Sequence, residues 1–304
     1  MNQKLWEQLC GIVGSDHTFT DEPMKKHTTF RIGGPADYFV QPHSRTEMAE
    51  VLKVCREASV PCFILGNGSN LLVGDLGFRG VVMQVFKNYC DIIREGDRLR
   101  VQAGALLSKV AKKALEYGLT GFEFAAGIPG TMGGAVCMNA GAYGGEMKDV
   151  LLSAAVLTKE LTVKTVGREE LDLGYRTSSI GKNGWIVLET VLQLSPGDPK
   201  KIAGRMEELK GQRVAKQPLE YPSAGSAFKR PQGYFAGKLI MDSGLCGFQV
   251  GDAQISEKHC GFIINRGNAT AKDVTELMAQ VQERVYEKFR VRLEPEIKRL
   301  GEFL

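Results

Sequence analysis

Apolar residues recur with the spacing of a helix in three parts of the chain. The first part follows the capping-box sequence SRTE at 44–47, and its apolar face consists of Met48, Val51, Leu52 and Cys55. The second runs over 107–118 and ends at a glycine, a residue that often terminates helices. The third begins at Thr270 with the sequence T-x-x-D and continues to Phe289. These patterns predict three amphipathic helices.

Short apolar runs between these helices predict strands. They are PCFIL at 61–65, VVMQVF at 81–86, RLRVQAG at 98–104, and the segments AAVLT, LTVKTV and WIVLETVLQL. A polar loop rich in glycine, GNGSNLLVGDLGFRG, separates the first two runs, and such a connection between strands is typical of a ligand-facing loop. The mixture of helices and strands predicts a fold with α/β and α+β parts.

A length of 304 residues is large for one hydrophobic core, so we expect two or three packed units. The sequence SPGDP at 195–199 marks a boundary, because Asp198 can cap a helix whose first residue is Pro199. We predict an α/β unit over 1–86, a second over 87–205, and an α+β unit over 206–304.

Composition places the chain among ordinary globular proteins, with 43% hydrophobic and 24% charged residues. The net charge of +4 gives no support for nucleic-acid binding, although it suits an anionic small ligand. No stretch approaches the ~20 apolar residues of a membrane helix, and the first residues lack a signal-peptide pattern. The seven cysteines and four histidines are scattered, without a C-x-x-C pair. We expect a cytoplasmic monomer with reduced thiols, no metal and no membrane or nucleic-acid partner.

Two glycine-rich loops could bring bare backbone to an anion. GNGSNL at 66–71 offers amides and a hydroxyl, and GIPGTMGGAVCMNAGAYGG at 127–145 holds seven glycines in nineteen residues. Glycine permits positive φ and close approach, so successive N–H groups can converge on a pyrophosphate. Neither loop matches a standard nucleotide-binding motif. The first could equally be an ordinary turn, and the second a place of tight strand packing. Two such loops together favour one elongated ligand.

The segment 221–240 combines basic residues with glycines and aromatics and contains no acid. Such a segment suits an anionic substrate, although three basic residues are more often part of a solvated loop. Ser226 lies there between small neighbours. Its hydroxyl is a very weak acid, so it can protonate only a strong base such as a carbanion. No G-x-S-x-G frame surrounds it, which argues against an α/β-hydrolase nucleophile.

Seven segments in order along the chain resemble the UDP-N-acetylenolpyruvoylglucosamine reductase family, flavoenzymes that make UDP-N-acetylmuramate for bacterial peptidoglycan. They are HTTFRIGGPADYFV (27–40), LGNGSNLLV (65–73), GFEFAAGIPGTMGGAVCMNAGAYGGE (121–146), YRTSS (175–179), SAGSAFKRP (223–231), AGKLI (236–240) and LEPEIKRLG (293–301). The resemblance implies a vanillyl-alcohol-oxidase-type (PCMH) FAD-binding fold. In that fold two α/β subdomains enclose FAD, and a C-terminal α+β domain binds the substrate.

The resemblance also implies which residues bind FAD without a covalent link. They lie in the two glycine-rich loops and are Gly66, Asn67, Gly68, Ser69, Asn70, Leu71, Gly127, Ile128, Pro129, Gly130, Thr131, Gly133, Gly134, Asn139 and Gly141. A nucleotide sugar is the implied substrate and NADPH the implied reductant. No residue that would read the 2′-phosphate can be named, so the expectation of NADPH over NADH rests on the resemblance alone.

The family's catalytic arginine, serine and glutamate fall on Arg176, Ser226 and Glu296. The implied reaction transfers hydride from NADPH to FAD and then to the terminal vinyl carbon of the enolpyruvyl group. Arg176 would hold the enolate-like charge that develops on the substrate carboxylate. Glu296 would polarise the same carboxylate, for which we expect a raised pKa. Ser226 would protonate the neighbouring carbon.

The chain departs from one part of the family's pattern. Longer members carry an insertion with a tyrosine that closes over substrate, whereas residues 177–220 contain no tyrosine here. We expect other residues of the shorter subtype to cover the substrate diphosphate, namely Lys229, Arg230, Tyr234 and Lys238. Two other functions stay open at this point. The chain could be another FAD oxidoreductase of the same fold, or a nucleotide-sugar-binding protein without redox chemistry, which would not need FAD.

Overall fold

The computed structural model describes residues 2–304, and its contacts group the chain into two compact units. The first unit consists of the described residues up to Phe19 together with Tyr38–Asn67 and Val81–Arg213. The second consists of Thr20–Asp37, Gly68–Gly80 and Val214–Leu304. Residue 206, the expected start of a third unit, lies inside helix α7, which runs without interruption over Pro199–Lys216. The three-part division stays a prediction.

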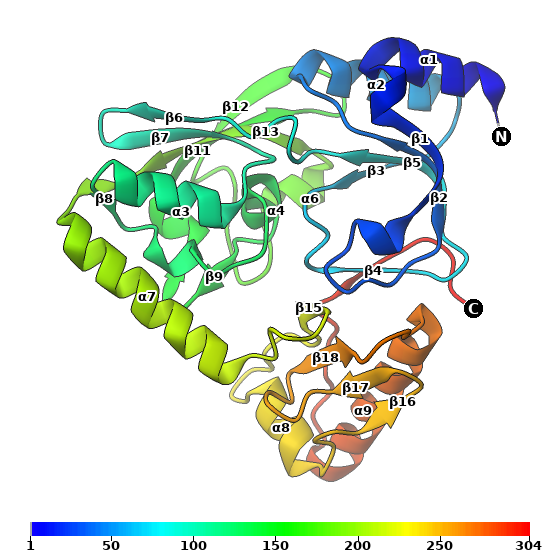
Figure 1. The fold of residues 1–304 in the computed structure, drawn as a ribbon, viewed down its shortest axis with the longest axis vertical. Coiled ribbons are helices and arrows are strands. Elements are labelled where there is room, and N and C mark those ends of the chain that lie inside the picture. Colours follow the sequence, from blue (N-terminus) through cyan, green and yellow to red (C-terminus); the bar gives the residue numbers. More distant parts are fainter. Residues whose placement is uncertain (1) are drawn as a thin grey trace. The chain divides into compact units, whose positions relative to one another are not determined.

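A five-stranded antiparallel sheet forms the centre of the first unit, with the order β12-β11-β13-β7-β6 (Figure 1). Its strands are β6 (Ile92–Glu95), β7 (Arg98–Gln102), β11 (Leu151–Leu157), β12 (Val163–Gly167) and β13 (Ile186–Gln193). Helix α4 (Met132–Cys137) packs against β7 and β13. Helix α3 (Leu107–Glu116) buries four apolar side chains in the same core: Leu107, Val110, Ala111 and Ala114.

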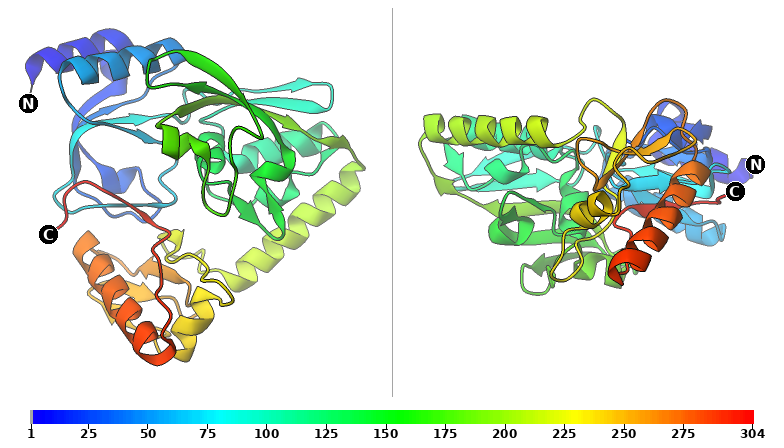
Figure 2. Two further views of the ribbon diagram at one scale, coloured as in Figure 1. Left: turned by 180° about the vertical axis from the view of Figure 1, so that it is seen from behind. Right: turned by 90° about the horizontal axis from the view of Figure 1, so that it is seen from below.

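A second sheet has the order β1-β2-β5-β3, with β3 and β5 parallel. Its strands are β1 (Thr18–Pro23), β2 (Pro35–Val40), β3 (Cys62–Leu65) and β5 (Phe78–Gln84). Helices α1 (Gln3–Val13) and α2 (Arg45–Glu57) lie side by side in the first unit (Figures 1 and 2). The short elements of this unit are α5 (Met147–Val150), α6 (Ser179–Asn183), and the strand pairs β8 (Leu119–Thr120) with β14 (Ser195–Pro196) and β9 (Gly141–Ala142) with β10 (Gly145–Glu146).

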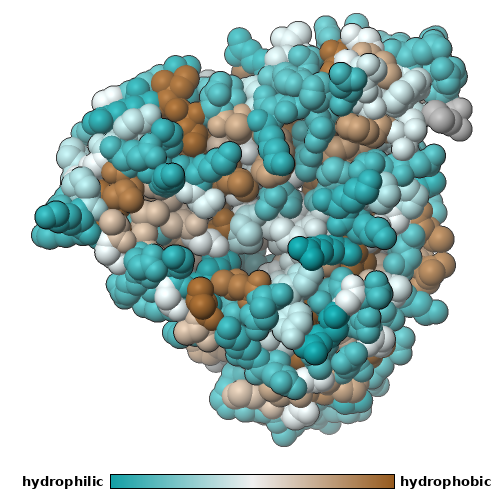
Figure 3. Space-filling view, in the orientation of Figure 1, coloured by the Kyte–Doolittle hydropathy of each residue, from teal (hydrophilic) through white to brown (hydrophobic). Residues whose placement is uncertain are grey.

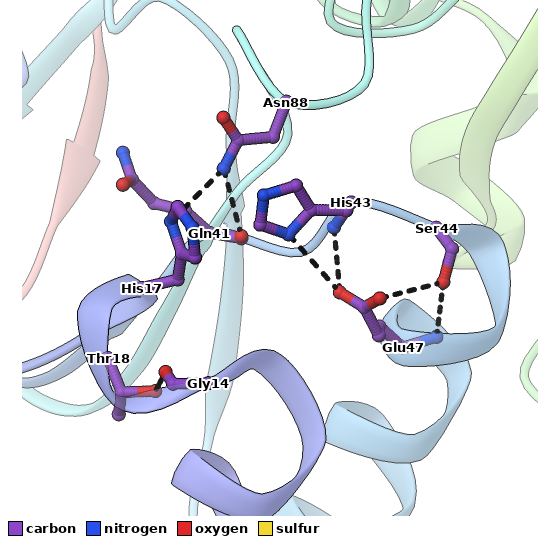
Figure 4. A network of polar contacts seen from close by, with 8 residues as sticks. All are labelled: Gly14, His17, Thr18, Gln41, His43, Ser44, Glu47 and Asn88. Carbon is purple, nitrogen blue, oxygen red and sulfur yellow. Dashed lines mark hydrogen bonds and ion pairs between the residues drawn. The ribbon is translucent and has the colours of Figure 1, made fainter.

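The predicted start of α2 is confirmed, with one difference in how its polar groups pair (Figure 4). The Ser44 hydroxyl accepts a hydrogen bond of 3.2 Å from the backbone N–H of Glu47, as an N-cap should. The Glu47 carboxylate accepts from the backbone N–H of His43, at 2.7 Å, one residue before the cap. In a regular capping box the Glu47 carboxylate would accept from the N–H of Ser44 itself. Here it accepts from the residue before Ser44.

The other predicted helix ends are confirmed. Each could be predicted because its signal lies within a few residues of the helix end. Gly118 follows α3 with a φ of +66°, a conformation that glycine adopts without a side-chain penalty. Asp198 accepts the N–H of Lys200 over 2.9 Å at the start of α7. Thr270 and Asp273 form a reciprocal capping box at the start of α9 (Ala271–Phe289).

The second unit has its own antiparallel sheet, of order β15-β18-β17-β16 (Figures 1 and 2). Its strands are β15 (Ser223–Ser226), β16 (Gln249–Val250), β17 (Ala253–Ile255) and β18 (Phe262–Asn265). Helix α9 packs against β16, β17 and α8 (Ala236–Asp242), and it buries Val274, Leu277, Met278, Val281 and Val285. The last strand, β19 (Lys298–Leu300), pairs in parallel with β4 (Leu71–Val73), which comes from the middle of the chain.

Hydrophilic residues cover most of the face seen in Figure 3, with hydrophobic residues between them. Across residues 2–304, no helix combines the length and apolar composition needed to cross a membrane. Within the same residues, no three or more His, Cys, Asp or Glu side chains are grouped to bind a metal.

Candidate functional site

The two glycine-rich loops meet in the first unit. The side-chain amide of Asn67 donates a hydrogen bond of 2.6 Å to the carbonyl of Pro129. Gly66 packs so closely on the buried Thr131 that a Cβ added there would lie 2.3 Å from the Thr131 hydroxyl oxygen. Residues 66–67 and 129–131 therefore form one continuous stretch of backbone surface, which suits the expectation of a single ligand that contacts both loops.

The glycines of 127–145 serve two different purposes. Some pack tightly: Gly133 donates its N–H to the carbonyl of Ala103 over 2.8 Å, and a Cβ on Gly145 would lie 2.7 Å from the Phe124 ring. Others are exposed: a Cβ on Gly134 would meet only the Thr131 hydroxyl oxygen, at 3.6 Å. Packing and ligand binding were alternatives from the sequence, and packing accounts for part of the loop. The exposed positions within this stretch, Gly127, Pro129 and Gly134, fit the pyrophosphate or flat ring system of FAD.

The GNGSN loop continues into the second unit at Gly68. This residue has a φ of +62°, and a Cβ there would lie 2.2 Å from the carbonyl oxygen of His27. Only glycine meets both requirements without displacement. The next residues end at Asn70, whose side-chain amide donates to the carbonyl of Glu296 at 3.2 Å and whose carbonyl accepts from Lys298 N–H at 3.0 Å. The far end of this loop is thus joined to the C-terminal segment.

Arg176 lies at the tip of a tight hairpin in the first unit. Gly174 and Thr177 exchange two backbone hydrogen bonds, of 3.1 and 3.3 Å, so that only two residues form the turn. Arg176 has a φ of +55°, which is uncommon for a residue with a side chain. Its guanidinium carbon lies 5.4 Å from the centre of the Tyr175 ring. Unusual backbone of this kind is concentrated at functional sites.

Ser226 ends strand β15 in the second unit and lies opposite Phe262 of β18. The register of this strand pair shifts between Ser223 and Ser226, where Gly225 has a φ of +77°. Such irregularities re-aim side chains at the edge of a sheet. The next residue, Ala227, donates its N–H to the Gly261 carbonyl at 2.8 Å, which fixes the backbone directly after the serine.

Glu296 lies on the segment next to Ser226. Its N–H donates to the carbonyl of Ala227 at 2.9 Å, and the residue is only 8% exposed. One step further on, Phe228 pairs with Pro295. The structure therefore brings Ser226 and Glu296 onto neighbouring segments of one unit, together with Asn70. Arg176 belongs to the first unit.

Two of the basic residues expected to meet the substrate have acidic partners at the surface. Lys229 pairs with Glu294 at 3.1 Å, and Lys238 pairs with Asp242 four residues later on α8. Exposed pairs of this kind contribute little stability, so an anionic ligand could compete with the carboxylate.

The other two expected substrate contacts lie together. The Arg230 guanidinium carbon lies 3.9 Å from the centre of the Phe235 ring, and its Nε donates to the carbonyl of Tyr234 at 3.4 Å. The Tyr234 side chain is itself exposed, as is Phe235. Stacking on an aromatic ring restricts the orientation of the planar guanidinium group, which suits recognition of phosphate groups.

No motif or spacing pointed to Arg213, a half-buried residue of α7. A Cβ on Gly127 would lie 3.0 Å from its Cδ and 3.2 Å from its Nη1, so its side chain covers the start of the glycine-rich loop. Burial lowers the pKa of the Arg213 guanidinium, and Tyr143 acts in the opposite direction. Arginine titrates so far above neutrality that it still places a cation beside this exposed backbone.

Two family models match the chain. The model described as an FAD binding domain matches residues 36–167. The model described as the C-terminal domain of UDP-N-acetylenolpyruvoylglucosamine reductase matches residues 217–300. The first model includes the whole GNGSN loop and the whole glycine-rich stretch, and the second includes Ser226 and Glu296.

Curated proteins of similar sequence extend the match to the full length. UDP-N-acetylenolpyruvoylglucosamine reductase of Agathobacter rectalis is 54% identical, with 100% of both chains covered. The proteins of the same name from Clostridium perfringens and Clostridioides difficile are 52% and 48% identical, each with 99% of both chains covered.

Solved structures agree with these matches. The UDP-N-acetylenolpyruvylglucosamine reductase of Thermus caldophilus superimposes with a TM-score of 0.81 at 38% identity, over 93% of this chain and 98% of that one. An alkyldihydroxyacetonephosphate synthase shares only the fold, with a TM-score of 0.50 at 17% identity over 64% of this chain and 41% of that one. The FAD-binding fold predicted from the sequence is confirmed.

Proposed function

Because the chain belongs to the UDP-N-acetylenolpyruvoylglucosamine reductase family, we propose that it reduces the enolpyruvyl group of UDP-N-acetylglucosamine enolpyruvate to give UDP-N-acetylmuramate. FAD is its non-covalent cofactor and NADPH its reductant. The product is a precursor of peptidoglycan, so the activity serves cell-wall synthesis and, through it, cell shape and division. In this proposal the enzyme is a cytoplasmic monomer.

The observation that carries the proposal is the hydrogen bond from the Glu296 N–H to the carbonyl of Ala227, at 2.9 Å. It fixes a carboxyl group and the Ser226 hydroxyl on adjacent segments. Reduction of an enolpyruvyl group adds a hydride to one carbon and a proton to the carbon beside the carboxylate. A weakly acidic hydroxyl on the segment beside a buried glutamate suits the second addition, because the carbon that receives the proton is a strong base.

Each of the three catalytic candidates has a different proposed role toward the substrate. When bound, FAD supplies the hydride chemistry. Arg176 binds the substrate carboxylate through its planar guanidinium and stabilises the negative charge that develops there. Glu296 polarises the same carboxylate, a role that is easier when its own carboxyl is protonated. Ser226 donates the proton to the neighbouring carbon.

The residues that would hold FAD are those of the two joined loops. Gly66 and Asn67 contribute from one side, and the exposed positions within 127–134 from the other. Gly68–Leu71 belong to the second unit and complete the set. Lys229, Arg230, Tyr234 and Lys238 are the proposed contacts of the substrate diphosphate.

A coupled assay tests the proposed function. Purified protein should be yellow and should release free flavin on denaturation. With UDP-N-acetylglucosamine enolpyruvate it should consume NADPH faster than NADH and form UDP-N-acetylmuramate. A yellow protein that oxidises NADPH without forming this product would be another FAD oxidoreductase. A protein that does not bind FAD would contradict the proposal entirely.

A further inference from the structure

Asn139 ends helix α4 in a conformation that most residues avoid. Its φ is +44°, its N–H donates to the carbonyl of Val136 at 3.3 Å, and the next N–H, of Ala140, donates to Ala135 at 2.8 Å. These two bonds make a Schellman motif, in which glycine is the preferred residue at the position of Asn139. Helix termination alone therefore does not explain why an asparagine is present.

The side chain of Asn139 is fully used inside the protein. The residue is 1% exposed, and its amide nitrogen donates to the Glu146 carboxylate at 2.6 Å and to the carbonyl of Gly174 at 3.2 Å. Its amide oxygen accepts the backbone N–H of Lys148 at 2.9 Å. Glu146 is fixed in turn, because its carboxylate caps α5 and pairs with the Lys148 ammonium at 3.2 Å. A buried amide with three partners holds one orientation.

The bond to Gly174 reaches the base of the Arg176 hairpin. The other strand of that hairpin is anchored as well, because the Ser178 hydroxyl donates to the carbonyl of Cys137 at 2.8 Å. Both anchors come from the end of α4 and both attach to residues that flank Arg176. A positive φ at a residue with a side chain persists only where its surroundings enforce it. The two anchors supply that enforcement.

We propose that Asn139 is a positioning residue for Arg176, which sets the direction of the guanidinium through the carbonyl of Gly174. The inference rests on the proposed function, since it assigns Asn139 to the step in which Arg176 acts on the substrate carboxylate. The sequence led us to expect that Asn139 contacts FAD. The proposal gives it a different role, because its side-chain amide already forms hydrogen bonds to three groups of the protein.

The decisive variant is Asn139→Gly. Glycine is at least as suitable as asparagine for the Schellman motif, so α4 still ends correctly while the anchor is lost. Ser59→Gly is a matched control. Ser59 is exposed, has a φ of +54°, and ends α2 with the same pair of hydrogen bonds, from its own N–H to Arg56 and from Val60 to Cys55. Asn139→Asp is a second variant, which keeps the acceptor oxygen and removes both donors.

Two stopped-flow measurements on the FAD-bound enzyme separate positioning from general damage. Asn139→Gly should leave the reduction of flavin by NADPH near the wild-type rate. It should slow the reoxidation of flavin by the enolpyruvyl substrate by about 10²-fold, the order expected when a catalytic group is misplaced by an ångström. In an Arg176→Ala background the same change should have no further effect on reoxidation, because the residue that it positions is absent.

Hydrogen exchange provides a readout that needs no substrate. The Gly174 and Thr177 amides close the hairpin, so they should exchange faster in Asn139→Gly and Asn139→Asp than in the wild type, and remain unchanged in Ser59→Gly. Unchanged exchange, equal slowing of both half-reactions, or an additive effect in the Arg176→Ala background would each overturn the inference. If the wild type does not act on the enolpyruvyl substrate, the proposed function fails. Hydrogen exchange alone then tests whether Asn139 holds the hairpin through Gly174.

Discussion

The side-chain amide of Asn70 donates a hydrogen bond of 3.2 Å to the main-chain oxygen of Glu296, although 226 positions separate the two residues. The carbonyl of Asn70 accepts from Lys298 N–H at 3.0 Å, and from there β4 and β19 run in parallel. One residue thus connects the end of the GNGSN loop to the peptide that carries Glu296. The position of Glu296 depends on the conformation of this loop as well as on its own segment.

Replacing Asn70 by alanine removes the side-chain donor to Glu296. We expect flavin reoxidation by the enolpyruvyl substrate to slow by roughly fivefold, because the loss of one hydrogen bond of about 1 kcal/mol leaves Glu296 less firmly placed. Reduction of the flavin by NADPH should change less. Stopped-flow absorbance of each half-reaction measures both rates. An equal loss in both would mean that Asn70 acts on FAD rather than on Glu296.

Ser226→Ala removes the proposed proton donor and leaves the backbone of β15 in place. NADPH should still bleach the flavin at nearly the normal rate, whereas reoxidation by substrate should fall about 10²- to 10⁴-fold. Ser223→Ala on the same strand is the comparison, since the carbonyl of Ser223 rather than its hydroxyl bonds to Thr29. Normal turnover of Ser226→Ala would exclude the serine as the acid.

Arg176→Lys keeps a positive charge but loses the planar pair of donors that a carboxylate requires. We expect kcat to fall by roughly 10²- to 10³-fold, with FAD content unchanged, because this interaction strengthens as charge develops on the substrate. Steady-state kinetics and the flavin-to-protein absorbance ratio check both statements. A variant with wild-type kcat would show that Arg176 has only a structural role.

Asp75 caps helix α9 from a distant part of the same unit. Its two carboxylate oxygens accept the N–H groups of Ala271 and Lys272 at 2.8 and 2.9 Å. Asp75→Ala should lower the free energy of unfolding by about 1–2 kcal/mol, because it removes both the cap and a negative charge at a helix N-terminus. Urea unfolding measures this difference. Glu207→Ala on the surface of α7 should change stability by less than about 0.5 kcal/mol, and a similar loss in both variants would contradict the capping role.

His259 makes stability depend on pH in a defined direction. Burial lowers its pKa below the usual value of about 6.5, and its Nδ1 accepts the Gly261 N–H at 3.1 Å. The folded state therefore binds this proton less readily than the unfolded state, so protonation favours unfolding. Its contribution to stability is present above pH 6.5 and is lost as the pH falls through the folded pKa.

The His259→Asn variant isolates this contribution, since asparagine can offer an oxygen in place of Nδ1. Urea unfolding at a series of pH values should give a shallower decline below pH 6.5 in the variant than in the wild type. Parallel curves for the two proteins would assign the pH dependence to other groups.

Helix ends were predictable from the sequence because their signals are local. Ser44, Asp198 and Thr270 each bond to a residue two or three positions away, so a single segment contains the whole signal. The segments that carry Ser226 and Glu296 were found through their resemblance to a family, and the bond that makes them neighbours is visible only in the structure.

The remaining features of the site and of the fold depend on contacts between distant segments. Asn139 reaches Gly174 across 35 positions, and Asp75 reaches Ala271 across 196. No periodicity or spacing in one sequence encodes such pairs. The glycines of 127–145 show the same difficulty, because exposed and tightly packed glycines have the same appearance in a sequence, and only their neighbours distinguish Gly134 from Gly145.

The parallel pairing of β4 with β19 joins two segments that are synthesised far apart in time. Ribosomes add about 5–20 residues per second, so the strand that completes this pair is made roughly 11–45 s after its partner. During that interval the GNGSN loop exists without the segment that Asn70 contacts. A growing chain therefore contains both glycine-rich loops before it contains Glu296, the residue that we propose polarises the substrate carboxylate.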